Sequence, residues 1–207
     1  MSGPAILVLG ATGPSGICVL RELIHHGQPA IAFVRNPAKV PQDLSENPLL
    51  DGESSDLHGP SAAVARSSAI ISLLGPTSLK VPDSTLYASF YAALFPIMAQ
   101  HKVRRILAMG TVSATLPQDR FSFLRWAFVT FLRLAGPTAY QTILSITQTF
   151  ESSAHKDVDW TIFRLFFATG DSDADTWRAL REQEDVFAGY IGEPGWTTSI
   201  HRAALAK

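Results

Sequence analysis

The chain has 207 residues, of which 46% are hydrophobic and 17% charged, and its formal net charge is −1. This length and apolar content suffice for one substantial core, and they predict a single domain over residues 1–207. The near-neutral charge provides no basic field for nucleic acid, so nucleic-acid binding is excluded. A single cysteine, Cys18, excludes a disulfide framework and favours a reducing compartment.

The apolar segments are too short or too interrupted to cross a membrane. The longest, Phe121 to Ala135, contains Arg125 and Arg133 and falls short of the ~20 residues that a bilayer span requires. The first apolar run has no basic region before it and is shorter than a signal sequence. We therefore expect a cytoplasmic protein with no membrane span. The six histidines lack the spacing of a metal site on one helix face, so we expect no metal.

An apolar run near the start of the chain leads directly into a glycine-rich turn. Residues 6–9 predict a buried strand, and Gly10, Gly13 and Gly16 follow with the spacing G-x-x-G-x-x-G rather than G-x-G-x-x-G. These glycines would allow a tight strand exit, a close approach to a pyrophosphate, and close packing of helix on sheet. The amides of residues 12–15 would then face an anion at a helix amino terminus. We predict nucleotide binding; the alternative is a turn that only connects a strand to a helix.

A second buried strand over residues 30–34 indicates a right-handed parallel crossover. It leads into Arg35 and Lys39, where a domain that prefers NAD often has an acidic residue against the ribose. Because a guanidinium suits the 2′-phosphate, we favour NADP over NAD, with a solvated basic loop as the alternative. After a third strand, Asp56 and Leu57 could bracket an adenine ring.

Strands and helices then alternate in the order of a doubly wound α/β fold. Strands are expected over residues 49–55, 69–75, 105–110 and 160–165, and helices over residues 60–66, 84–100 and 140–153. We predict a Rossmann-type parallel sheet with helices on both faces, a three-layer αβα sandwich. Leu74 and Gly75 end the fourth strand, where the backbone would pass beneath a cofactor. Ser113, after the fifth strand, would bond a substrate carbonyl or the nicotinamide amide, or would cap the next segment.

Residues 117–137 interrupt this alternation with a run that is apolar nearly all round. A helix of this kind must be covered on most sides. It is an ordinary packed helix, a lid over an apolar substrate or a partner-binding surface, and we favour a lid or a homodimer contact through residues 121–135. Residues 171–207 complete a small substrate-side region, with a strand expected at 186–190 and a helix at 199–206. Because that helix ends abruptly at the end of the chain, we expect a truncated or disordered terminus.

Several motifs together resemble the atypical short-chain dehydrogenase/reductases. They are Gly-Ala-Thr-Gly-Pro-Ser-Gly at 10–16, Val-Arg-Asn-Pro at 34–37, Asp-Leu at 56–57, Asp-Trp-Thr-Ile-Phe-Arg at 159–164 and Ile-His-Arg-Ala at 200–203. Within that group the chain is most similar to the NAD(P)H-binding, NmrA-like proteins, and more distantly to the flavin/biliverdin-IXβ reductases. The resemblance covers essentially the whole chain, and it implies a Rossmann fold with NADP lying across the strand ends.

The resemblance also implies roles for individual residues. The cofactor residues that it implies are Gly10, Thr12, Gly13, Pro14, Ser15 and Gly16 at the pyrophosphate, Arg35 and Lys39 at the 2′-phosphate, Asp56 and Leu57 at the adenine, and Leu74 and Gly75 on the ribose side. Relatives that reduce carbonyls carry Tyr-x-x-x-Lys, in which the lysine helps the phenol to donate a proton. Here Tyr140 is the matching tyrosine, but Leu144 stands in the lysine position, and Leu165 stands where many relatives have proline. The candidate catalytic residues are therefore Ser113 and Tyr140, with solvent as an alternative acid.

We expect an NADP-dependent reductase that acts on an apolar, conjugated or aromatic small molecule such as a flavin, a quinone or a polyketide-like compound. Such molecules accept hydride into a conjugated system, so a strong protein acid is less necessary, and residues 121–135 would supply an apolar wall. The missing lysine favours one alternative, a non-catalytic NADP-binding sensor that signals to a protein partner. An isomerase or cyclase on the same fold is a second alternative.

Overall fold

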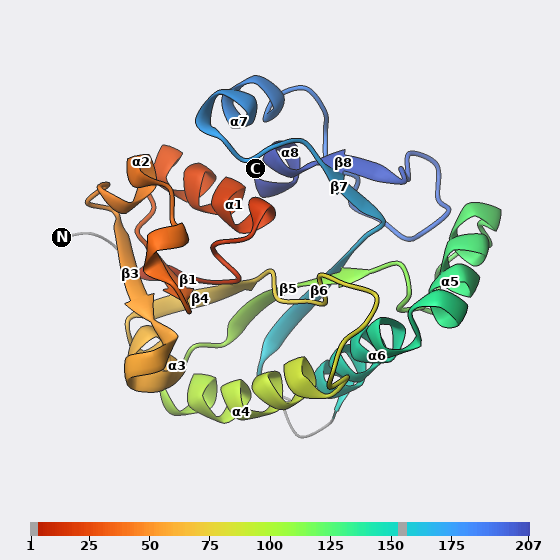
Figure 1. Cartoon of the computed structure of the whole chain (residues 1–207), viewed down its shortest axis with the longest axis horizontal. Helices are drawn as coiled ribbons and strands as arrows, with labels where there is room; N and C mark the ends of the chain where they lie inside the picture. Colours follow the sequence, from red (N-terminus) through yellow and green to blue (C-terminus); the bar gives the residue numbers. More distant parts are fainter. Residues whose placement is uncertain (1–3, 153–156) are drawn as a thin grey trace.

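A six-stranded parallel sheet forms the centre of the molecule (Figure 1). The computed structural model describes residues 4–152 and 157–207, without the side chains of residues 54–58. The strands are β1 (Ala5–Leu9), β2 (Ala30–Val34), β3 (Leu50–Ser54), β4 (Ser67–Ser72), β5 (Arg105–Thr111) and β6 (Asp159–Leu165). Their order, β3-β2-β1-β4-β5-β6, is that of the Rossmann fold, so the predicted fold class is confirmed.

Helices cover both faces of this sheet (Figure 1). On one face lie α1 (Pro14–His25) and the short α2 (Gln42–Ser45), which follows the 3-10 turn η1 (Pro37–Lys39). On the other face lie α3 (Ser55–Ala65), α4 (Leu86–Gln100) and α6 (Pro137–Glu151). Successive strand residues point to opposite faces: Leu7 and Leu9 belong to the core under α4, whereas Val8 packs with Leu20 of α1. Burial on both faces explains why the strands read as continuous apolar runs.

The helix after β3 begins earlier than the sequence predicts. We expected a helix over residues 60–66, but α3 begins at Ser55 and is broken at Gly59, whose φ is +59°. Pro60 has no N–H to donate to the preceding turn, and the glycine takes up the resulting change of direction.

The carboxyl-terminal region also departs from the prediction. It contains β7 (Phe167–Thr169), α7 (Ala174–Leu180), β8 (Ser199–His201) and α8 (Arg202–Ala206). The predicted strand at 186–190 is wrong, because the N–H of Tyr190 donates to the Glu193 side chain rather than to a neighbouring strand. The predicted helix at 199–206 begins only at Arg202, because Ser199–His201 pair in parallel with β7.

This carboxyl-terminal region is fastened to α1 by a buried carboxylate. Glu22 is 3% exposed and accepts hydrogen bonds from Arg181 Nε at 3.0 Å, from Arg181 Nη2 at 2.5 Å and from Trp177 Nε1 at 3.2 Å. Burial acts to raise the pKa of Glu22, but the hydrogen bonds and charge of Arg181 outweigh it and hold the pKa below its usual value. Glu22 therefore fixes α7 against α1 as an ionised group.

The segment predicted to be a covered apolar helix forms α5 (Phe123–Ala135). Ser122 caps it by accepting a hydrogen bond from the N–H of Arg125. Of its side chains only that of Val129 is buried, while Phe123 is 65% and Leu134 81% exposed, so the expectation that most sides are covered is wrong for the single chain. No helix within the described residues is long and apolar enough to cross a bilayer.

Candidate functional site

The glycine-rich turn follows β1 directly and depends on two of its glycines. Gly10 has φ +76°, which side chains rarely adopt, and a Cβ there would lie 3.1 Å from the backbone of Leu73. A Cβ on Gly16 would lie 2.8 Å from the Cα and carbonyl carbon of Ala11, and closer still to the carbonyl oxygen of Gly10. Both positions therefore require glycine, and α1 packs closely against the strand exit.

The same turn leaves backbone donors free at the start of α1. Gly13 is the N-cap and Pro14 the first helical residue, and the side chains of the first turn include no acid. The N–H groups of Ser15 and Gly16 precede the first residue that can bond within the helix, since Ile17 already donates to the carbonyl of Gly13. Unpaired amides and the positive end of the helix dipole together suit an anion such as a pyrophosphate.

The neighbouring strand ends place further predicted cofactor residues beside this turn. β2 and β4 both pair with β1, with Phe33 and Ser72 opposite Leu9, so the segments after them leave the sheet at the same edge. Arg35 and Lys39 are exposed, and neither forms an ion pair with a side chain that the structure describes. The far side of the turn is formed by residues 73–75, where a Cβ on Gly75 would meet no atom within 4 Å. The side chains of Asp56 and Leu57 lie outside the described residues.

Ser113 follows β5 at this edge and carries an unsatisfied hydroxyl. The residue is 3% exposed, and its Oγ has no hydrogen-bond partner among the described residues. Buried polar atoms are nearly always paired, so an unpaired hydroxyl at the sheet edge that carries the predicted cofactor turn is a candidate ligand contact. The backbone N–H of Ser113 donates to Thr111 Oγ1 at 3.2 Å, and this bond does not involve the Ser113 hydroxyl.

Two arginines hold the backbone on both sides of Ser113. Arg125 Nε donates to the carbonyl of Val112 at 2.7 Å, and Arg164 Nη1 donates to the carbonyl of Ala114 at 3.0 Å. Burial lowers the pKa of Arg125 below its usual value. The backbone around Ser113 is therefore fixed by charge-assisted bonds from α5 and from β6.

Arg164 is held in turn by a buried carboxylate that the sequence pattern did not reveal. Its Nη1 and Nη2 donate to Asp119 Oδ2 and Oδ1 at 2.5 and 2.6 Å, and the two side chains are 8% and 3% exposed. Burial acts to raise the pKa of Asp119, but the hydrogen bonds from Arg164 and from the N–H of Leu116 hold it below its usual value. Asp119 also accepts from the N–H of Ile191, so the same pair fastens the carboxyl-terminal loop.

Tyr140 lies in the first turn of α6, which begins at the same edge of the sheet because α6 runs antiparallel to β5 and β6. Its hydroxyl accepts a hydrogen bond from Arg133 Nη2 at 2.8 Å, and the Arg133 guanidinium lies 5.0 Å from the ring centroid. No hydrogen bond joins Tyr140 to Ser113 within the described residues, so the structure does not bring the two candidate catalytic groups into direct contact. Arg133 was not among the predicted residues, because it lies on a different helix.

A cavity of about 720 Å³ adjoins the turn. Ser15 and Val19 of α1, Leu73 after β4 and Leu107 of β5 line its inner end. Most of its remaining wall comes from residues 161–167 and from the carboxyl-terminal segments 186–191 and 196–200. Its other lining residues are Glu22, Leu23, His26, Ile71, Leu116, Arg202, Leu205, Ala206 and Lys207. The prediction that residues 121–135 supply an apolar wall is wrong for this cavity, because none of them lines it. The aromatic side chains of this wall are Phe163, Phe166, Phe167, Phe187, Tyr190 and Trp196. The sequence predicts a substrate-side region over residues 171–207, but it does not indicate which of these residues line the cavity, since the loops carry no periodic pattern.

Comparisons with known proteins agree with this geometry. The family model described as NAD(P)H-binding matches residues 10–207. No curated protein sequence matches the chain.

Within the described residues, no group of three or more histidine, cysteine, aspartate or glutamate side chains could hold a metal ion.

Three solved structures illustrate the similarity of fold. A wide-type short-chain dehydrogenase/reductase from Veillonella parvula in complex with NADP is 14% identical, with a TM-score of 0.68 over 98% of this chain and 83% of that one. Gre2 from Candida albicans in complex with NADPH is 12% identical, with a TM-score of 0.65 over 99% and 72%. The UDP-N-acetylglucosamine 4-epimerase from Bacillus cereus is 13% identical, with a TM-score of 0.64 over 99% and 71%.

At these identities the solved structures show similarity of fold alone. The family model, in contrast, covers nearly the whole chain, including the glycine-rich turn. The sheet order and the turn geometry are the features that this family requires. The chain therefore belongs to the NAD(P)H-binding family.

Proposed function

We propose that the chain is an NADP-dependent reductase that acts on an apolar, conjugated or aromatic small molecule. The observation that carries this proposal is the position of Ser15, which belongs to the predicted pyrophosphate turn and also lines the aromatic cavity. A cofactor bound at the turn would therefore reach a space whose walls include Phe163, Phe166 and Trp196. Pockets of this size and apolar character suit a flat conjugated substrate.

The chain's own groups provide what such a reduction needs. NADPH, when bound, supplies the hydride. The Ser113 hydroxyl has no internal partner and is free to donate to an oxygen or nitrogen that gains negative charge as hydride arrives. Arg125 and Arg164 keep the backbone beside Ser113 in place. The Tyr140 hydroxyl accepts from Arg133, so its own proton remains free, while neither Tyr140 nor Ser113 is among the residues that line the cavity.

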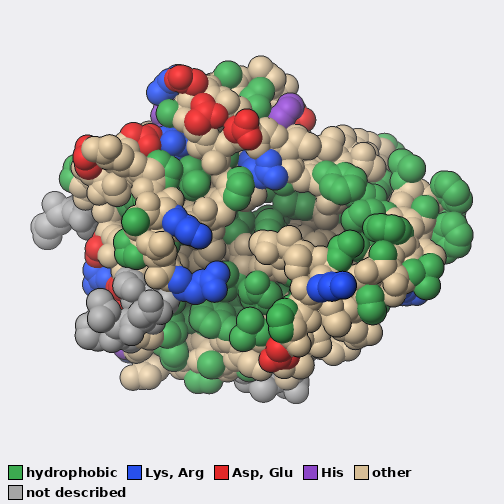
Figure 2. Space-filling model, in the orientation of Figure 1, with side chains coloured by type: hydrophobic (Ala, Val, Ile, Leu, Met, Phe, Trp, Pro, Cys, Tyr) green, Lys and Arg blue, Asp and Glu red, His purple; other side chains and the backbone are tan. Residues whose placement is uncertain are grey.

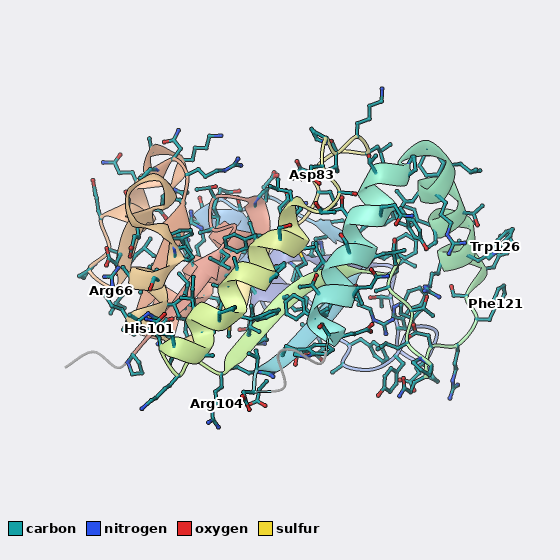
Figure 3. The ribbon with its side chains drawn as sticks, turned by 90° about the horizontal axis from the view of Figure 1, so that it is seen from below. Arg66, Asp83, His101, Arg104, Phe121 and Trp126 are labelled. Atoms are coloured by element: carbon teal, nitrogen blue, oxygen red, sulfur yellow. The ribbon has the colours of Figure 1, made fainter. Side chains whose placement is uncertain are left out.

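The proposed preference for NADP rests on Arg35 and Lys39. Both are exposed at the end of β2, and the 2′-phosphate of NADP is the group that would distinguish it from NAD there. Arg35→Ala should weaken NADPH binding roughly 10- to 100-fold, as expected for a charged hydrogen bond, and should change NADH binding little. The measurement is a fluorescence titration with each nucleotide. Arg104→Ala, an exposed arginine at the opposite edge of the sheet, is the matched control (Figure 3).

Equal weakening of NADPH and NADH binding by Arg35→Ala would overturn the 2′-phosphate assignment. A second experiment tests the reaction itself: Ser113→Ala should lower kcat about 100-fold while leaving the NADPH dissociation constant unchanged. Unchanged turnover would remove Ser113 from the proposed mechanism. The oligomeric state in solution tests the homodimer contact that the sequence suggests through residues 121–135, and a cytoplasmic location stays a prediction.

A further inference from the structure

The outward side of α5 presents a continuous set of large apolar side chains to solvent. We call this set, together with the residue just before the helix, the α5 outer face; its members are Phe121 (79% exposed), Phe123 (65%), Leu124 (61%), Trp126 (55%), Phe131 (55%) and Leu134 (81%). Phe121 and Trp126 extend outward from the edge of the molecule in Figure 3. Single exposed apolar residues are ordinary, but a contiguous aromatic face of this kind marks an interaction surface.

The charged side chains of the segment that carries the α5 outer face are all of one sign. No aspartate or glutamate occurs from residue 120 to residue 150, whereas Arg120, Arg125 and Arg133 do. Arg120 and Arg133 are exposed at its margins, and Asp119 is buried in its pair with Arg164. One carboxylate from another segment lies near this margin: Glu193 follows Gly192, which packs beside Arg120, and it accepts a hydrogen bond from the N–H of Tyr190. Figure 2 shows apolar side chains gathered over this end of the molecule with no acidic side chain among them.

We propose that the α5 outer face docks on an anionic phospholipid surface. A helix with phenylalanine, tryptophan and leucine on one face and arginine at its margins is the kind that lies in a membrane interface, where the rings enter the headgroup boundary and the cations meet lipid phosphates. A second copy of the chain fits less well. A symmetric contact would bring the same arginines together and would offer them no carboxylate.

The inner side of α5 connects this face to the cavity. The Phe128 ring lies 4.5 Å from the Phe166 ring and 5.4 Å from the Phe167 ring, measured between centroids, and both of those residues line the cavity. If the proposed function holds, an apolar substrate dissolved in the bilayer would meet aromatic side chains all the way from the lipid to the cavity. The docking itself does not depend on that reaction.

Co-sedimentation of the whole chain with phospholipid vesicles tests the proposal. We expect binding to vesicles of phosphatidylcholine with phosphatidylglycerol, and much weaker binding to phosphatidylcholine alone. Trp126→Ser and Phe131→Ser should each reduce partitioning about tenfold, because each removes a large apolar side chain from the interface. Leu86→Ser, an equally exposed apolar residue on α4, is the control and should leave binding unchanged.

Charge variants separate lipid attraction from local structure. Arg133→Gln should weaken binding to the anionic vesicles about fivefold, as expected for one cation near a charged surface, and Arg133→Lys should retain it. Thermal unfolding of each variant checks that it folds. Absence of binding to anionic vesicles, or binding that Trp126→Ser and Phe131→Ser leave intact, would overturn the proposal. A stable dimer that Phe131→Ser dissociates would also overturn it. The assay contains neither NADPH nor substrate, so its failure would leave the proposed reduction standing.

Discussion

Alanine substitutions at two glycines of the turn after β1 should affect stability differently, because the surroundings of the two glycines differ. In Gly16→Ala the new methyl would lie 2.8 Å from backbone atoms of Ala11, which cannot rotate away. Overpacking of this kind costs about 1–3 kcal/mol, which lowers the Tm of a chain of this length by roughly 2–12 °C. In Gly13→Ala the nearest atom is the carbonyl oxygen of Gly10 at 3.4 Å, and the backbone is already extended at φ −76° and ψ 159°. That variant should keep the stability of the wild type.

Gly13→Ala, which should keep its stability, should nevertheless lose affinity for NADPH. A methyl on Gly13 would occupy the space through which the backbone approaches a pyrophosphate, and a steric cost of about 1–3 kcal/mol corresponds to a roughly 5- to 150-fold loss of NADPH affinity. Thermal melts without nucleotide, followed by NADPH titrations, measure both effects, with Gly52→Ala on β3 as a control that should leave NADPH affinity unchanged and raise stability by at most about 1 kcal/mol. If Gly13→Ala binds NADPH like the wild type, the turn only connects strand to helix and the phosphate assignment fails.

Two further predictions concern the buried ion pairs. Asp119→Ala leaves Arg164 buried without its carboxylate and should cost about 3–5 kcal/mol of unfolding free energy, whereas replacing both residues with apolar ones should recover much of that loss in urea titrations. Glu22 has a pKa below its usual value, so its stabilising contribution is complete above the ordinary glutamate pKa and is lost as the pH falls through the depressed native value. Stability measured by urea unfolding should therefore fall below about pH 4, and it should fall less steeply in Glu22→Gln.

Much of the fold could be predicted because the parallel strands are buried on both faces. The runs at Ala30–Val34 and Arg105–Thr111 are short and apolar and are bounded by turn residues, so their positions follow from composition alone. The pairing of β7 with β8 could not be predicted, since each strand has three residues and their pairing depends on tertiary placement. The sequence left open whether α5 is a packed helix, a lid or an interaction surface, because an apolar run does not reveal which of its sides the rest of the chain covers.

Some residues of the candidate site could likewise be predicted from the sequence, and others could not. The turn residues were readable because glycine spacing reports directly on backbone geometry. The arrangement around Ser113 was not readable: Arg164 lies 45 residues from Asp119, and Arg125 reaches the carbonyl of Val112 from a separate helix. Such contacts are set by how the elements pack, and no local pattern encodes them. For the same reason Arg133 could not be identified as the partner of Tyr140.

The most direct test of the central claim is the oxidation of NADPH by the purified chain in the presence of flavins, quinones and aromatic ketones. We predict saturable binding of NADPH and its oxidation with at least one of these acceptors, and we predict that Gly13→Ala loses both. Tight NADPH binding with no oxidation across the whole panel would contradict the proposed reductase, and would favour a protein that binds the nucleotide without transferring hydride.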